Sequence, residues 1–429
     1  MSSTIARPGW KGERAVKPTG PTQVARLLAR HAFAWLVLAN AVGVMLAALL
    51  LWPESNGWLG PMTYGRWLPL HLDWQLYGWC ALPLVGVLLA WCLDVRHPRA
   101  LAHAHLVLGA WSVALALGGW SWLTGVTSGK MFLEWHGWAR PLLPVAMLLL
   151  WSVLAAHVWW RRDELSRRAV TARIAVLLAL VLVPNALYWS AGREFYPSMN
   201  PDSGGATGSR LLASTLGIVA IYGFIAEVAG IARASRRKWY WGYFLVSALV
   251  CIGIEHGNTS HHDLIQIAGL ATLLGWLPLA WMYWGGGMPA ARRWWGAAFA
   301  WWLALVASGF WTFLPGVSER LKFTNGMVAH AHLAMAGLVT SANFAVLVEL
   351  RGVKASRGFW LWQTACAVHV ALLLTLGWLE VSSEPAVFLS SPWIQAIYAG
   401  RLAAGVLMLL ASIQWWRCSM AQGECEVLR

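Results

Sequence analysis

Apolar residues fill this chain in long runs that short polar stretches separate. Each run is close to the roughly twenty residues that an α-helix needs to cross the hydrocarbon core of a bilayer. Inside a bilayer a segment satisfies its backbone hydrogen bonds only in a helix or a closed barrel. The runs therefore predict an all-α, polytopic membrane bundle of about twelve transmembrane helices. The runs lie near residues 26–52, 67–93, 101–123, 139–160, 171–190, 208–232, 239–256, 262–284, 294–315, 326–348, 358–380 and 391–416.

Basic residues mark alternate connections between these segments. The connections after even-numbered segments carry most of the arginine and lysine, and the intervening ones carry fewer. By the positive-inside rule we expect both termini in the cytoplasm. Residues 1–24 are then a basic cytoplasmic tail without the apolar core of a cleavable signal. Residues 25–417 form the membrane domain, and 418–429 form a short cytoplasmic C-terminal tail.

Composition supports a membrane protein. Of the 429 residues, 59% are hydrophobic and 12% are charged, whereas a soluble domain averages about 25% charged residues. The lipid bilayer is thus the expected environment. In a soluble protein a net charge of +14 would suggest nucleic-acid binding, but here it reflects topology, and no nucleic acid is expected. The 33 tryptophans fit interfacial belts and, in a second interpretation, flat walls beside a planar cofactor.

The chemistry centres on two histidines in the tenth segment. His330 and His332 are separated by one alanine in a stretch that is otherwise largely apolar. Positions two apart on an α-helix point about 200° from each other, so the two imidazoles face opposite sides and cannot share one metal. An ionisable side chain inside a membrane segment is a functional candidate. One helix is therefore expected to serve two cofactors.

Other histidines fall at the same expected depth. His71 lies near the outer end of the second segment, level with His330 and His332. Imidazoles on facing helices of an apolar bundle suit the axial positions of haem iron. We expect His71 and one of His330 and His332 to hold a first haem, and the other to hold a second. The outer turn between the seventh and eighth segments adds His256, His261 and His262.

A second group of histidines is expected at the cytoplasmic end. The string Ala102-His103-Ala104-His105-Leu106 has the same letters as the one at His330, but its helix runs in the opposite direction. The histidines on this side could ligate a cofactor in the inner leaflet, but the favoured interpretation is that they are solvated residues of the membrane interface. His136 and His369 are interpreted as structural. The cytoplasmic group consists of His31, His97, His103, His105 and His157.

At the outer histidines the chain resembles subunit I of the haem–copper oxidase superfamily. The resemblance is to the C-family oxidases and the large subunit of bacterial nitric oxide reductase. The motifs that carry it are Gly65-Arg66-Trp67-Leu68-Pro69-Leu70-His71, Ala329-His330-Ala331-His332-Leu333-Ala334 and Tyr398-Ala399-Gly400-Arg401. The resemblance implies that His71 and His332 hold a low-spin haem and that His330 holds a high-spin haem. It also places Arg66 and Arg401 near haem propionates, whereas the residue types alone equally fit an interfacial role for Arg66.

The pattern departs from this family at the second metal. The family takes one histidine from the sixth helix and an adjacent pair from the seventh, but the sixth segment here contains no histidine. In one alternative, Glu255, His256, His261 and His262 bind copper or non-haem iron, because histidine with carboxylate is ordinary iron ligation, and Glu255 is catalytic. In the other, the second metal is absent and the chain relays electrons or binds a gas.

The expected function depends on whether the second metal is present. The six cysteines form no CxxCH motif, so covalent c-type haem is not expected here. We expect two b-type haems, one low-spin and one high-spin, and a cytochrome c or c-haem subunit as electron donor. The resemblance implies a respiratory complex with other membrane subunits in the bacterial cytoplasmic (inner) membrane, with haems near the outer face and O2 or NO as substrate. The relay alternative delivers electrons to a partner subunit or quinone. A haem-free transporter is a third class, and it leaves the matched histidine depths unexplained.

Overall fold

The computed structural model describes residues 20–194, 211–228, 232–254, 263–284, 291–321, 324–353, 358–382 and 391–421. Over its described residues, each predicted apolar segment coincides with one helix or with a run of adjoining helices. In chain order they are α1 (Gly20–Leu51); α2 (Tyr64–Asp73), η2 (Trp74–Cys80) and α3 (Leu82–Cys92); α4 (Ala100–Leu123); α5 (Leu142–Trp160); α6 (Arg167–Leu180) and α7 (Leu182–Ala191); α8 (Leu211–Val228); α9 (Arg237–Ile254); α10 (Leu264–Ala271), η6 (Thr272–Gly275) and α11 (Trp276–Trp284); α12 (Arg292–Thr312); α14 (Asn325–His332), η7 (Leu333–Val339) and α15 (Thr340–Glu349); α16 (Phe359–Ser382); and α18 (Pro392–Met420). Short helices in the connections are η1 (Pro53–Leu59), η3 (Gly137–Ala139), η5 (Ala234–Arg236) and α13 (Ser318–Leu321).

The chain is a helical membrane bundle. Among the described residues, nine helical segments are long and apolar enough to cross a bilayer. The segments at α8, α9 and α12 are helical but are not among these nine, so the total of twelve spans stays a prediction. Large apolar side chains point outward from several helices, as expected where lipid replaces water. Examples are Leu178, Leu182, Leu245 and Leu264.

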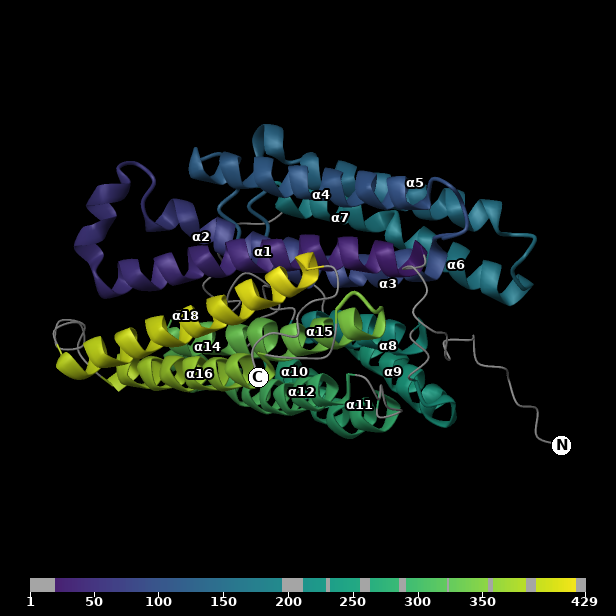
Figure 1. Cartoon of the computed structure of the whole chain (residues 1–429). Coiled ribbons are helices and arrows are strands. Elements are labelled where there is room, and N and C mark those ends of the chain that lie inside the picture. The colour runs from purple at the N-terminus through teal and green to yellow at the C-terminus, as the bar shows by residue number, and fades with distance from the viewer. Residues whose placement is uncertain are drawn as a thin grey trace.

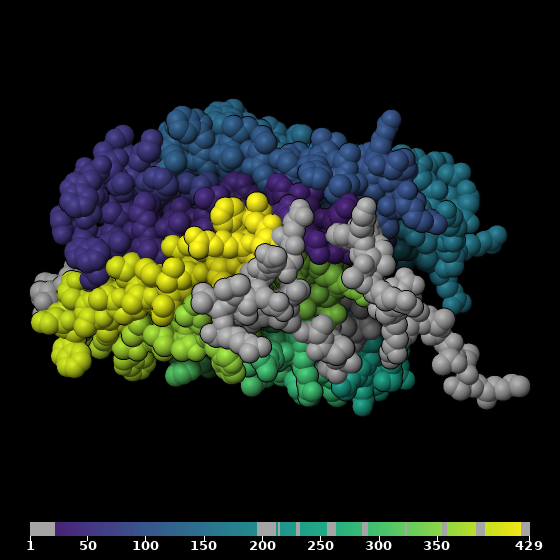
Figure 2. Space-filling model, in the orientation of Figure 1, coloured from purple at the N-terminus to yellow at the C-terminus, as the bar shows by residue number. Residues whose placement is uncertain are grey.

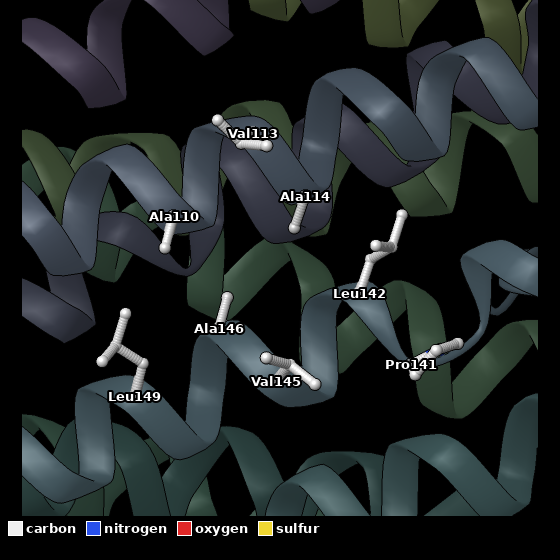
Figure 3. A pocket seen from close by; sticks show the side chains of 8 residues that line it. All are labelled: Ala110, Val113, Ala114, Pro141, Leu142, Val145, Ala146 and Leu149. Carbon is white, nitrogen blue, oxygen red and sulfur yellow. The ribbon is translucent and has the colours of Figure 1, made fainter.

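One hollow on this outer surface lies between α4 and α5 (Figure 3). Its lining is entirely apolar and contains no donor, acceptor or titratable side chain, so it carries no chemistry of its own. The lining residues are Ala110, Val113, Ala114, Pro141, Leu142, Val145, Ala146 and Leu149.

Helix α1 connects the two sides of the bundle. It packs against α18 on one side and against α2, η2, α3 and α4 on the other. Figure 1 shows α4, α5 and α7 beyond α1 on one side and α14, α16 and α12 below α18 on the other. In the space-filling view, the yellow atoms of α18 lie directly along the purple atoms of α1 (Figure 2). Helix α2, which carries His71, packs directly on α1, and α14, which carries His332, packs on α16, which in turn packs on α18.

Two π-helical segments lie at the middle of the bundle. Segment η2 begins three residues after His71, and η7 begins at the residue that follows His332. A π-turn accommodates an extra residue in the helix and is frequent at functional sites. The two segments contact each other, and Trp79 Nε1 donates a hydrogen bond to Thr340 Oγ1 at 2.8 Å. The helix distortions are thus packed together beside the two histidines.

Asn343 reinforces this contact. Its buried side-chain amide donates to the carbonyls of Trp79 and Cys80, both at 3.2 Å. We expect Asn343→Ala to lower the free energy of unfolding by about 1 kcal/mol, because hydrogen bonds between membrane helices contribute about this much. Thermal unfolding in detergent measures the effect. Asn185→Ala is the matched control, because Asn185 is exposed and bonds only to Val181 of its own helix. Equal melting temperatures for the two variants would show that the hydrogen bonds of Asn343 do not stabilise this contact.

Candidate functional site

Helices α2 and α14 bring His71 and His332 together. The centroids of their imidazole rings are 6.5 Å apart, and the ring planes differ by 25°. A metal–imidazole bond is about 2 Å long, so two imidazoles on opposite sides of one metal ion have centroids roughly 6 Å apart. The spacing of this pair fits a single iron between the two rings.

Backbone carbonyls fix the orientation of both rings. His71 Nδ1 lies 2.9 Å from the carbonyl oxygen of Ala39 on α1, and His332 Nδ1 lies 2.8 Å from that of Val328 on its own helix. A carbonyl only accepts, so Nδ1 carries the proton in both rings. The lone pair of each imidazole is then on Nε2, the arrangement usual for histidines that ligate metals.

Glycine at position 43 of α1 makes room for His71. A Cβ atom at this position would lie 2.6 Å from His71 Cε1 and 2.8 Å from Nδ1. Real carbon atoms do not approach so closely, so any larger residue moves the ring. Gly43 and the Ala39 carbonyl lie one turn apart on α1, and together they define where the imidazole lies.

His330 points to a different neighbour. Its Nδ1 lies 3.4 Å from Ser308 Oγ of α12, and its ring meets the edge of Phe313 at a centroid distance of 6.3 Å. Gly309 lies against the same ring, where a Cβ would be 3.1 Å from His330 Cε1. His330 and His332 therefore serve separate sides of α14, and His330 has no second histidine among its described neighbours.

His369 was not anticipated as part of the site. It lies on α16 with its ring 4.7 Å from that of His332, and it is buried. Its Nδ1 lies 3.3 Å from the carbonyl of Arg401. Its Nε2 has no hydrogen-bond partner within the described part of the chain. Sequence position alone suggested an isolated structural histidine, and only the packing of α16 on α14 reveals the contact.

A polar cluster lies at the start of α14. Arg401 Nη1 donates to Asn325 Oδ1 at 3.1 Å, and Asn325 donates to the Glu380 carboxylate through its backbone and side-chain nitrogens, both at 2.6 Å. Arg401 Nε is buried and has no partner among the described residues. Arg66 lies apart from this cluster, with its guanidinium against Gly125. The buried Arg401 Nε is the donor that an anionic group would satisfy.

The residues of the expected second metal site, Glu255, His256, His261 and His262, lie outside the described residues. The helices on either side are described, and Gln266 Nε2 of α10 donates to the carbonyl of Ile254 at the end of α9 at 2.9 Å. This bond joins the described ends of α9 and α10, which precede and follow residues 255–262 in the chain.

A buried carboxyl pair lies close to His71. Asp73 is fully buried, and Glu134, from the connection after α4, is 4% exposed. Burial raises the pKa of Glu134 to about 7. Neither carboxylate oxygen of Asp73 has a hydrogen-bond donor from elsewhere in the described structure. Facing carboxyl groups avoid two buried charges by holding a proton between them.

Comparison with known proteins agrees with this architecture. No protein-family model and no curated protein matches the chain. A solved structure, a heme-copper terminal oxidase dimer determined by cryo-EM, matches with a TM-score of 0.58 over 96% of this chain and 86% of that chain. This chain has the oxidase fold. At 14% sequence identity the likeness concerns the oxidase fold and leaves the ligands and substrate to be argued from the residues.

Proposed function

We propose that this oxidase-like chain is the membrane haem subunit of a respiratory complex. It accepts electrons from a cytochrome c or c-haem subunit and reduces O2 or NO. The observation that carries the proposal is the His71–His332 pair, with nearly parallel rings 6.5 Å apart and both Nδ1 atoms bound to carbonyls. In the proposal these two residues hold a low-spin b-type haem, and His330 holds a high-spin one.

The residues have distinct tasks in this proposal. A haem held by two histidines exchanges electrons, and a haem held by one leaves a position for a gas. His71 and His332 are held in place from α1 and α14, and Ser308 orients His330. Arg401, and with it Arg66, supplies positive charge for the propionates, since buried guanidinium groups favour carboxylate partners.

The second metal is part of the proposal in which the chain reduces O2 or NO. Glu255, His256, His261 and His262 would hold copper or non-haem iron, with Glu255 as the catalytic carboxylate. The Gln266 hydrogen bond joins the described helix ends that precede and follow these residues in the chain. The mixed nitrogen and oxygen donors suit either metal.

A second candidate is a relay without this metal. It is favoured by the absence of histidine from α8, the helix that corresponds to one of the metal-ligand positions in the resembled family. Such a subunit would pass electrons to a partner subunit or quinone, or would bind a gas.

Metal and haem stoichiometry of the purified chain, with a reduced-plus-CO difference spectrum, tests both forms. Two haems, a CO-binding fraction and an additional copper or iron support the reductase. Two haems without that metal support the relay. A purified chain that binds no haem would overturn both.

His330→Ala separates the two haems. We expect the variant to keep the six-coordinate low-spin spectrum and to lose essentially all CO binding, because no other described histidine contacts His330. The control is Ser308→Ala, which removes only the hydrogen-bonding partner of His330 and should retain CO binding. An unchanged CO difference spectrum in His330→Ala would show that the gas-binding iron is held elsewhere.

Orientation is part of the same proposal. In the proposal both termini lie in the cytoplasm, as the basic connections after even-numbered segments favour, and His71 and His330 lie toward the outer face of a bacterial inner membrane. This orientation suits a donor outside the cytoplasmic membrane.

A further inference from the structure

Three histidines outside the haem site meet at one point. His97 follows α3, His103 lies in the first turn of α4, and His157 lies in the last turn of α5. Their ligand atoms all lie within 4.8 Å of one another. The cluster is remote from His71, because Trp74 contacts Leu115 further along α4 and roughly 18 Å of helix separates Leu115 from His103.

The spacing matches metal ligation. His103 Nδ1 and His157 Nε2 are 3.0 Å apart. Two nitrogens on one tetrahedral metal lie roughly 3.3 Å apart, because each bond is about 2.0–2.1 Å long. The third imidazole therefore needs only a small movement, of about 1–1.5 Å, to complete a three-histidine set.

Packing holds these rings in place. His97 stacks on Trp160 with centroids 4.5 Å apart and planes 8° apart. His157 meets the edge of the same indole at 4.9 Å and is fully buried. This burial differs from the solvated interface residues expected from the sequence, because Trp160 and the connection after α3 cover His157.

The surrounding charges select the kind of metal. Arg99 and Arg161 act electrostatically on His103 and His157, and Asp94 opposes them. Asp94 itself pairs with Arg96 at 3.1 Å. Hard cations need several oxygen ligands and negative charge, and the nearby carboxylate of Asp94 is already paired with Arg96. Imidazole nitrogens suit zinc and copper.

We propose that His97, His103 and His157 form a binding site for a divalent transition metal of the zinc and copper class. Three protein ligands leave the fourth tetrahedral position for water.

Metal binding requires one proton to move. The amide of Asp94 donates to His157 Nδ1 at 3.1 Å, so in the metal-free protein Nε2 carries the proton and donates it to His103 Nδ1. On binding, the metal takes the lone pair of Nε2, and the proton of His157 moves to Nδ1. The Asp94 amide then donates its hydrogen bond to water instead, which the surface connection between α3 and α4 permits.

A Cu2+ titration followed by electron paramagnetic resonance tests this site in the full chain with its haems, after chelator treatment. We expect the wild type to bind one more Cu2+ than His97→Ala or His103→Ala, with nitrogen couplings from imidazole, and a large excess of Zn2+ to displace this copper, because such sites bind Cu2+ more tightly than Zn2+. Each variant should weaken binding at least 10-fold and leave the haem spectrum unchanged.

The matched control is His105→Ala. His105 lies two residues beyond His103, is exposed, and bonds only to the Leu101 carbonyl. It should bind copper as the wild type does. Equal Cu2+ binding by wild type and His103→Ala, with both haem spectra intact, would overturn the site whether or not the haem assignment holds.

Discussion

Replacing His332 with alanine should remove the six-coordinate low-spin haem spectrum completely, and His71→Ala should do the same. In the proposed assignment each ring offers Nε2 to one iron, and the centroids of the two rings are 6.5 Å apart. His369 is the nearest described histidine, but its ring lies beside that of His332, on α16. Losing either ligand leaves at most one axial bond. Reduced-minus-oxidised spectra and haem content per chain measure the effect.

His105→Ala is a close control for this experiment. His105 is the second histidine of an Ala-His-Ala-His string, as His332 is. Its Nδ1 makes the same local bond, to the carbonyl four residues earlier, at 2.9 Å. Loss of that bond alone should leave the spectrum unchanged. Gly43→Ala provides an intermediate case, because its Cβ displaces the ring of His71 without removing the ligand. Full haem content and unaltered spectra in both ligand variants would refute the assignment.

Gly377→Ala should lower the free energy of unfolding by about 2–3 kcal/mol, as overpacking of a tight interface does, and Gly377→Leu should abolish haem incorporation. A Cβ at position 377 of α16 would lie 2.2 Å from the backbone nitrogen of Gly326 and 2.6 Å from its Cα. The obstacle is backbone, so no side-chain rotation relieves it. Helix α14 would have to move, and it carries His330 and His332.

Gly296→Ala on α12 is the matched control for Gly377. A Cβ there meets nothing within 4 Å, and alanine is the better helix former by about 1 kcal/mol. Melting temperature and haem content should be maintained or slightly improved. If Gly377→Ala behaves as Gly296→Ala does, α14 and α16 are not in the close contact described.

Hydrophobic patterning predicted the helical membrane fold well. A stretch of about twenty apolar residues leaves few alternatives to a helix in a bilayer, and every predicted segment is helical where it is described. Depth along the chain placed His71 level with both His330 and His332, and the packing of the helices brings the ring of His71 within 6.5 Å of that of His332. The haem ligation that we infer from this approach stays a prediction.

Contacts that depend on the rotation of a helix about its axis were harder to predict from the sequence. His369 occupies the middle of a long apolar helix, and nothing in its neighbours along the chain indicates that it faces His332. His157 was expected to be solvated because it lies near a helix end, but it is buried, and the covering indole of Trp160 follows from tertiary packing. The polar residues Asn343 and Thr340 stand within an apolar segment, and they are the feature of the sequence that indicates a contact near the π-helical segments.

The π-turn after His332 sets the rotation, about the helix axis, of the residues that follow it on the same helix. An α-helix advances about 100° per residue, so the extra residue in η7 rotates α15 by that amount relative to the two histidines. Thr340 and Asn343 reach Trp79 because of this offset. His330 and His332 precede η7 and face different neighbours by ordinary helix geometry, and the extra residue lets the same helix present the Asn343 amide to the carbonyls of Trp79 and Cys80. The spacing between these groups in the sequence therefore differs from the one a regular helix would require.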